Sequence, residues 1–207
     1  MRQPGSSWDV SENHSGAGGA PKPVPQPSIQ PESVPAADTG ETGRDAPKVL
    51  IACFSRSGNT LQIASWIEER VGGDLFRIET ERAYPTDYDA VLEEARREQR
   101  ENARPALSAS VEDMEQYDVV FVGYPIWFGD TPMVVLSFLE SYDFSGKTVV
   151  PFCTSGGSAP QTSYASVRRT VPDAAVAEGF WVRGSEAGAA QRDCDAWIDG
   201  LRIFGSP

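Results

Sequence analysis

The feature that most constrains the fold is an apolar run, residues 49–54, that passes directly into a loop of mostly small polar residues. Because the run lacks the polar alternation of a half-buried strand, it predicts a strand covered on both faces, as in a parallel sheet. The loop consists of Ser55, Arg56, Ser57, Gly58, Asn59 and Thr60. A helical pattern follows at once, and the backbone N–H groups and helix dipole at such a junction favour an anion. The stretch therefore predicts a phosphate site in which positively charged side chains contribute little.

By itself this loop does not decide between a phosphate site and a plain capped helix, because Ser and Thr are common N-cap residues. It lacks the Gly-Lys-Ser/Thr ending of a Walker A loop and the spacing of Gly-x-Gly-x-x-Gly. Asn59 stands six positions after Cys53, where a thiol-phosphatase loop would have Arg. These observations argue against three common phosphate loops, so the decision depends on the rest of the chain.

Charge and residue counts exclude several function classes. The chain has 18 Lys and Arg against 30 Asp and Glu, a net charge of −12, which argues against nucleic acid or an anionic membrane as partner. The charge suits a protein that docks to a partner with a basic surface. Three Cys imply no disulfide framework, and Cys53 and Cys153 lie in apolar runs. The single histidine, His14, lies in a polar segment, so a His-based triad or metal site in the folded domain is excluded.

Residues 1–47 predict a disordered tail. They hold 8 of the 16 prolines, many Gly and Ser, and no Leu or Phe, so they cannot bury enough apolar surface to offset their ordering entropy. No apolar segment follows Met1, so the sequence as written predicts neither a signal peptide nor a transmembrane helix. We expect a cytoplasmic protein, with export as the alternative if a signal or anchor precedes this sequence.

From residue 48 to residue 207 the chain predicts one domain of alternating strands and helices. The predicted strands are residues 49–54, 74–80, 119–123, 148–153 and 174–182, and the predicted helices include 60–71, 88–101, 164–171 and 191–203, with another after Pro132. This alternation predicts a doubly wound, five-stranded parallel α/β sheet of order 2-1-3-4-5 with helices on both faces. Ligands of such sheets bind beyond the carboxyl ends of the strands, where the strand order reverses.

Loops after the first, third and fourth strands should therefore meet at one crevice. The second of these loops contains Pro125, Ile126, Trp127, Phe128, Gly129 and Asp130, and the third contains Thr154, Ser155, Gly156, Gly157 and Ser158. Trp127 could fold back onto the core, and the diglycine could be a plain turn. Their occurrence together, after the right strands, instead favours a phosphorylated, flat, aromatic ligand such as flavin mononucleotide (FMN).

Residues 48–204 resemble the flavodoxin family. The resemblance lies in the loop 55–60, in Gly123-Tyr-Pro-Ile-Trp-Phe-Gly129 and in the loop 154–158. The chain is most similar to short flavodoxin-like proteins with a Gly-Tyr-Pro-Ile-Trp second loop, flanked by Tyr84-Pro85 and Asn102-Ala-Arg-Pro105. The resemblance implies FMN as cofactor, the first loop as its phosphate site and Trp127 as its stacking aromatic. The third loop lacks a second stacking aromatic, since Ala159-Pro160 stands in that region.

Several roles stay open at this point. The Asp130 carboxylate could lower the flavin potential or could only complete a turn, and Arg56 could contact the phosphate or point to solvent. Gly129 could permit a backbone flip toward the flavin. The resemblance implies a monomeric electron carrier, which the acidic charge favours. The alternatives are an FMN-dependent NAD(P)H or quinone reductase and a binding module without flavin.

Overall fold

Six strands and five α-helices make up the part of the chain that the computed structural model describes, residues 46–204. These residues belong to one compact unit. The predicted tail, residues 1–47, lies outside the described residues except for Ala46 and Pro47, and His14 lies outside them too. Within residues 46–204, no helix is both long enough and apolar enough to span a lipid bilayer.

The strands and helices alternate along the chain as the sequence predicts. The strands are β1 (Val49–Cys53), β2 (Asp74–Arg77), β3 (Val119–Pro125), β4 (Thr148–Ser155), β5 (Ala175–Val176) and β6 (Phe180–Arg183). The α-helices are α1 (Asn59–Val71), α2 (Tyr88–Glu101), α3 (Met133–Glu140), α4 (Gln161–Thr170) and α5 (Gln191–Gly200), and short 3-10 helices occur at Met114–Gln116 and Ala187–Ala189.

All strands of the sheet are parallel, and their order is β2-β1-β3-β4-β5, with β6 also paired to β4. The first strand lies between the second and the third, so that Ile51 pairs with Leu75 on one side and with Phe121 on the other. Every residue of β1 is buried, as expected for an apolar run without alternation. The predicted doubly wound topology is confirmed.

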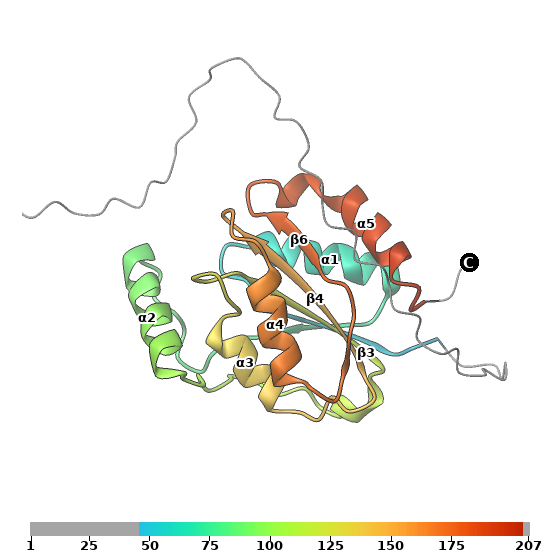
Figure 1. Cartoon of the computed structure of the whole chain (residues 1–207), viewed down its shortest axis with the longest axis horizontal. Coiled ribbons are helices and arrows are strands. Elements are labelled where there is room, and N and C mark those ends of the chain that lie inside the picture. Colours follow the sequence, from blue (N-terminus) through green and yellow to red (C-terminus); the bar gives the residue numbers. More distant parts are fainter. Residues whose placement is uncertain (1–45, 205–207) are drawn as a thin grey trace, which may run out of the picture. The chain divides into compact units, whose positions relative to one another are not determined.

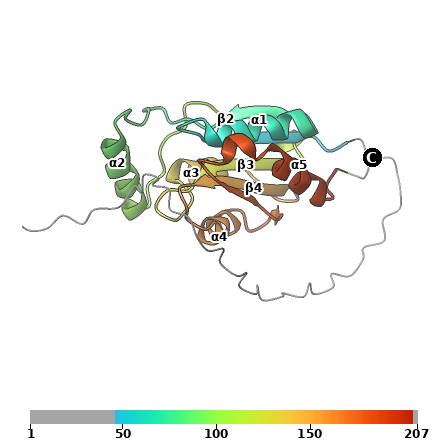
Figure 2. The same ribbon diagram turned by 90° about the horizontal axis from the view of Figure 1, so that it is seen from above.

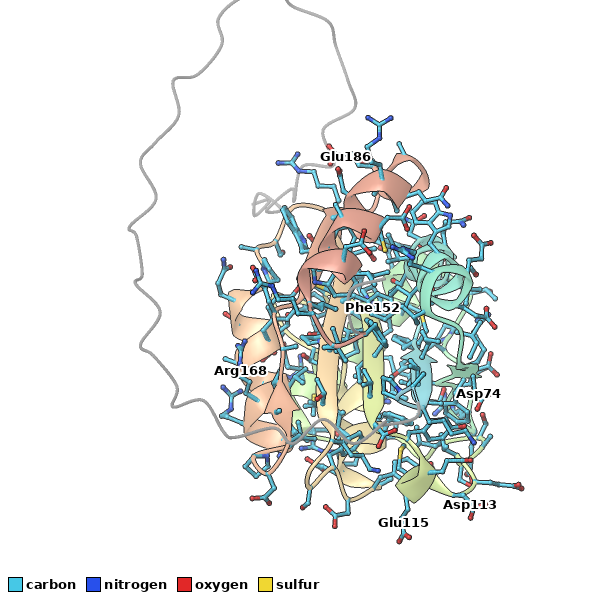
Figure 3. All side chains as sticks on the ribbon, turned by 90° about the vertical axis from the view of Figure 1, so that its right-hand side faces the viewer. Asp74, Asp113, Glu115, Phe152, Arg168 and Glu186 are labelled. Carbon is cyan, nitrogen blue, oxygen red and sulfur yellow. The ribbon has the colours of Figure 1, made fainter. Side chains whose placement is uncertain are left out.

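Two helical layers enclose the sheet (Figures 1 and 2). Side chains of α1 and α5 form one apolar core with one face of the sheet, and Phe152 lies at the centre of this side (Figure 3). Side chains of α3 and α4 form the second core with the other face. The remaining helix, α2, lies beyond the ends of the strands in both ribbon views and packs beside α3.

The predicted fifth strand, residues 174–182, is divided into β5 and β6. Two residues of β4, Val150 and Pro151, lie opposite three residues, 177–179, so the register slips by one between the two short strands. Ala177 N donates to Val149 O at 2.9 Å, and a continuous parallel ladder would next need an N–H at position 151. Proline has none, which interrupts the ladder and leaves a bulge.

Two other predicted elements, the second strand and the last helix, were too long. The second strand ends at Arg77 instead of residue 80, although Ile78 N still donates to Cys53 O at 3.0 Å. The last helix ends at Gly200 instead of residue 203, because Arg202 has a φ of 52°, which is incompatible with a right-handed helix.

Candidate functional site

The three predicted loops converge at the carboxyl ends of β1, β3 and β4. Thr60, at the start of α1, and Thr154, near the end of β4, share a buried hydrogen bond of 2.9 Å between their hydroxyls. Ile126 N donates to Thr154 O at 2.8 Å, which joins the second loop to the third. The ring of Phe54, just before the first loop, lies 5.1 Å from the ring of Trp127. The loops therefore form one site, called the mouth below.

The first loop leaves donors without partners at the start of α1. Gly58 occupies the N-cap position with a φ of 91°, a left-handed conformation that favours glycine, and no side chain caps the helix. The N–H groups of the first turn have no acceptor within the helix, and that turn holds no acidic residue. The hydroxyl oxygen of Ser55 is buried and has no hydrogen-bond partner among residues 46–204. These donors fit an anion such as a phosphate group.

Arg56 is exposed, and its side chain extends from the first loop toward the segment before α2. Its Nη2 donates to Thr86 O at 2.8 Å, and its guanidinium carbon lies 6.0 Å from the ring centroid of Tyr88. The side chain thus connects the first loop to the segment before α2. In this arrangement the groups available to an anion at the first loop are backbone N–H groups and hydroxyls more than a cation.

The second loop is a tight turn held by its own backbone. Trp127 and Asp130 exchange two N–H to carbonyl bonds of 3.0 Å each, and the residues between them, Phe128 and Gly129, have φ values of 48° and 79°. Positive φ at both central residues is typical of a type I′ turn. Asp130 Oδ1 accepts the N–H of Thr131 at 2.7 Å, so this carboxylate binds the backbone directly after the turn; its effect on a flavin potential stays a prediction.

Trp127 lies at the mouth and also packs against the core. Its ring is edge-on to Phe54 at 5.1 Å and to Tyr84 at 5.2 Å, and it is partly buried. Phe128, beside it at the tip of the turn, is 38 % exposed, and the guanidinium of Arg96 from α2 lies 4.8 Å from its ring. The mouth therefore has an aromatic wall that both the second loop and the α2 region build.

The third loop is held by one hydroxyl group. Ser155 Oγ donates to Ser158 O at 2.8 Å and accepts the Gly157 N–H at 3.1 Å and the Trp181 indole N–H at 3.0 Å. A Cβ placed on Gly156 or Gly157 would meet no atom within 4 Å. The diglycine therefore borders open space beside a rigid loop, which suits backbone hydrogen bonds to a planar ligand.

Four contributors to the mouth were missed by the sequence reasoning. Tyr84 was named only as part of the family resemblance, and no pattern indicated Glu98, Trp181 or Gly184 as part of the site. Gly184 N donates to Ser155 O at 2.8 Å, and a Cβ on Gly184 would lie 3.0 Å from Asn59 Nδ2. The segment after β6 thus closes against the first and third loops. Such contacts between loops leave no periodic signal in a sequence.

The cysteines near the mouth are not nucleophiles. Burial raises the pKa of the Cys53 thiol to about 12, although Arg77 opposes this shift, and burial likewise raises the pKa of Cys153 to about 12. Because the thiolate is the reactive form, both side chains are inert at neutral pH. What the mouth offers is binding: donors for an anion, an aromatic wall and a glycine loop.

A mouth of this kind, at the point where the strand order reverses, defines the flavodoxin-like class of doubly wound α/β proteins. A sequence model of the flavodoxin family matches residues 48–201. The chain therefore belongs to the flavodoxin family. A search of curated proteins found no significant match.

Solved structures agree with this assignment. A candidate flavoprotein from Bacteroides eggerthii is 34% identical, with a TM-score of 0.67, over 75% of this chain and 98% of that one. A candidate flavoprotein from Bacteroides uniformis is 30% identical, with the same TM-score, over 75% of this chain and 99% of that one. A flavoprotein from Lactobacillus acidophilus, solved in complex with FMN, is 23% identical with a TM-score of 0.58, over 70% of this chain and 98% of that one. The last likeness concerns the fold alone.

Proposed function

We propose that this protein binds FMN at the mouth and carries electrons. The observation that carries the proposal is the juxtaposition of the α1 N-terminus, the Ser55 hydroxyl and the Trp127 wall, where the first two have no side-chain partner among residues 46–204. Membership of the flavodoxin family supports the choice of FMN. When bound, FMN supplies one- and two-electron redox chemistry, and the protein supplies binding, orientation and electrostatics.

Each loop has a distinct role in this proposal. The first-turn N–H groups of α1, with Ser55 and Asn59, hold the phosphate. Trp127 stacks on the planar ring, and Gly156 directs its backbone N–H to a carbonyl oxygen of the ring. The Gly157 N–H stays bound to Ser155 Oγ. Ser155 acts indirectly, because its three hydrogen bonds keep the third loop in shape.

The net charge of −12 supports a carrier that meets a redox partner with a basic surface, because complementary charge raises association rates. We propose that the carrier is a monomer. An FMN-dependent NAD(P)H or quinone reductase would instead oxidise NADH or NADPH with a quinone at a steady rate. A carrier gives no such turnover, and a flavin-free binding module remains colourless after incubation with FMN.

The decisive experiment is an absorption spectrum of the purified protein, followed by identification of the released cofactor. The protein as proposed shows the visible bands of oxidised flavin, directly or after addition of FMN, and releases FMN on denaturation. A protein that is colourless after incubation with FMN and removal of the unbound FMN would disprove the proposal.

The stacking role of Trp127 can be tested with a matched control. Trp197 on the opposite side of the sheet is also partly buried and also contacts two rings, Phe121 at 5.8 Å and Phe180 at 5.2 Å. We expect Trp127→Ala to leave the fold intact and weaken FMN binding about tenfold or more, since stacking of a base on an aromatic contributes roughly 1–3 kcal/mol.

The Trp197→Ala control loses comparable ring contacts and should bind FMN like the wild type. Flavin titration measures the affinity, and circular dichroism checks that both variants are folded. Equal affinity in the wild type and Trp127→Ala would remove Trp127 from the site.

A further inference from the structure

The α2 segment, residues 81–106, is attached to the sheet through a narrow base. Thr80 and Leu107 form an isolated antiparallel bridge, with Glu81 N donating to Ala106 O and Ser108 N to Glu79 O, both at 2.9 Å. Beyond this base the helix lies past the ends of the strands (Figures 1 and 2). Its position relative to the mouth therefore depends on a few side-chain contacts.

One of these contacts reaches the aromatic wall directly. The rings of Phe54, Tyr84 and Trp127 contact one another pairwise, at centroid distances between 5.1 and 5.8 Å. The Tyr84 hydroxyl donates to Glu98 Oε2 at 2.9 Å. Because Glu98 lies on α2 and Trp127 on the second loop, this tyrosine links the helix to the residue that would stack on the flavin.

Glu98 is an unusual residue for this place. It is 7 % exposed, although it carries a carboxylate, and no ion pair to it occurs among residues 46–204. A buried carboxylate without a cation is unfavourable, so an apolar residue at this position would give a more stable helix contact. The titratable and charged groups that face Glu98 are Tyr84, from the chain before α2, and Glu94 and Arg97, from α2 itself.

We propose that Tyr84 and Glu98 are positioning residues that hold Trp127 in its place for FMN, and that the charge on Glu98 makes this support pH dependent. The proposal rests on the proposed function. An ionised carboxylate accepts a stronger hydrogen bond than a neutral carboxyl group does. Protonation of Glu98 therefore loosens Tyr84, and with it the aromatic wall.

The direction of the pH effect follows from the surroundings of Glu98. Burial raises its pKa, the hydrogen bond from Tyr84 lowers it, Glu94 raises it and Arg97 lowers it, with burial the largest influence. Protonation then occurs at a higher pH than for an exposed glutamate. FMN affinity should thus be highest above this pKa and should fall as the pH decreases through it.

The test measures FMN affinity by fluorescence titration of the flavin-free protein between about pH 5 and pH 8. Near pH 8 we expect Tyr84→Phe and Glu98→Gln to bind FMN about three- to tenfold more weakly than the wild type, because a bond to a charged acceptor contributes more than a neutral one. The Gln variant keeps an acceptor, so it should retain more affinity than Glu98→Ala. The difference between wild type and both variants should disappear at low pH.

Two controls exclude a general structural effect. Tyr142→Phe removes a hydroxyl that accepts the Val111 N–H at 2.7 Å, and Tyr117→Phe removes a hydroxyl that donates to Asp74 Oδ2 at 2.7 Å. Both bonds lie outside the α2 segment, and both variants should leave FMN affinity and its pH profile unchanged. Titration of the phosphate of FMN itself is common to every variant and cancels in the comparison.

A second measurement needs no flavin. Carboxyl carbon resonances report the titration of Glu98 in the flavin-free protein, and Tyr84→Phe should raise its pKa, since the phenol bond lowers it. If the wild type binds FMN and both variants have the same FMN affinity as the wild type at every pH, this proposal is overturned and the proposed function stands. Wild type that binds no FMN would overturn both, and an unchanged Glu98 titration in Tyr84→Phe would overturn the positioning alone.

Discussion

Beneath α1 and α5 the sheet is covered by apolar side chains, whereas beneath α3 and α4 several hydroxyl groups are buried with them. On the first side Phe121 stacks with Phe204 at 6.2 Å. On the second side Thr131 Oγ1 donates to Ser163 O at 3.0 Å, and the buried Tyr124 hydroxyl lies close to both residues but has no hydrogen-bond partner among residues 46–204. Only the second side continues into the Tyr84 and Trp127 contacts of the mouth.

The difference separates two tasks that one sheet performs. Apolar packing on the α1 and α5 side gives stability without directional constraints. Hydrogen bonds on the other side, such as that from Thr131 Oγ1 to Ser163 O, fix orientations, because most buried polar groups are hydrogen-bonded to partners in defined places. Substitutions on the first side should therefore change unfolding, and those near the mouth should change binding.

The largest expected effect belongs to the apolar side. Phe121 is 0 % exposed, and Phe121→Ala should lower the free energy of unfolding by about 3–5 kcal/mol, through lost burial and a residual cavity. Urea unfolding measures this change. A loss of FMN affinity in the folded fraction of this variant would contradict the assignment of stability to one side of the sheet and binding to the other.

An intermediate effect is expected where the two sides meet at the mouth. Thr154→Val removes the hydroxyl that pairs with Thr60 and leaves the Thr60 hydroxyl buried without its partner. We expect a loss of about 1–3 kcal/mol in the free energy of unfolding. The double variant Thr60→Val with Thr154→Val should lose less than the sum of the single variants; strict additivity would show that the bond contributes nothing.

The smallest effect is expected for a polar contact at the surface. Arg104 Nε lies 2.6 Å from Glu140 Oε2, with side chains 31% and 43% exposed, so Arg104→Gln should lower the free energy of unfolding by only about 0.2–1 kcal/mol. The bond from Arg104 lowers the pKa of Glu140. Stability from this pair is therefore present above the unfolded-state pKa and lost as the pH falls through the folded one.

Urea unfolding at neutral pH and near pH 3 tests that sign, because the difference between wild type and Arg104→Gln should shrink on acidification. A difference that grows on acidification would contradict the assignment.

Topology was predictable because the strand residues are apolar on both faces. Runs such as 49–54 and 119–123 cannot be half-exposed, and buried parallel strands require crossover helices. The division of the fifth strand was not predicted, since it depends on Pro151 in the neighbouring strand. Nor was the placement of α2, because helical periodicity shows which face is buried but not what it packs against.

For the mouth, the convergence of the three loops was predicted and is present in the structure, while the individual roles are proposals. The sequence did not show that Asp130 Oδ1 binds the Thr131 N–H, because this depends on where one carboxylate oxygen lies. It also gave no sign of Trp181, whose indole supports the third loop from 26 positions away. Turn chemistry is local and can be inferred from a sequence, whereas contacts across the mouth exist only once the chain is folded.

Thr80 and Leu107 pair at the base of the α2 segment, residues 81–106. Changes in the sequence of this segment therefore have little effect on the sheet. Insertions or deletions between Thr80 and Leu107 need not disturb strand pairing, since loops of this kind tolerate changes in length. A family with this design can acquire new recognition surfaces beside the mouth while its core sequence stays the same.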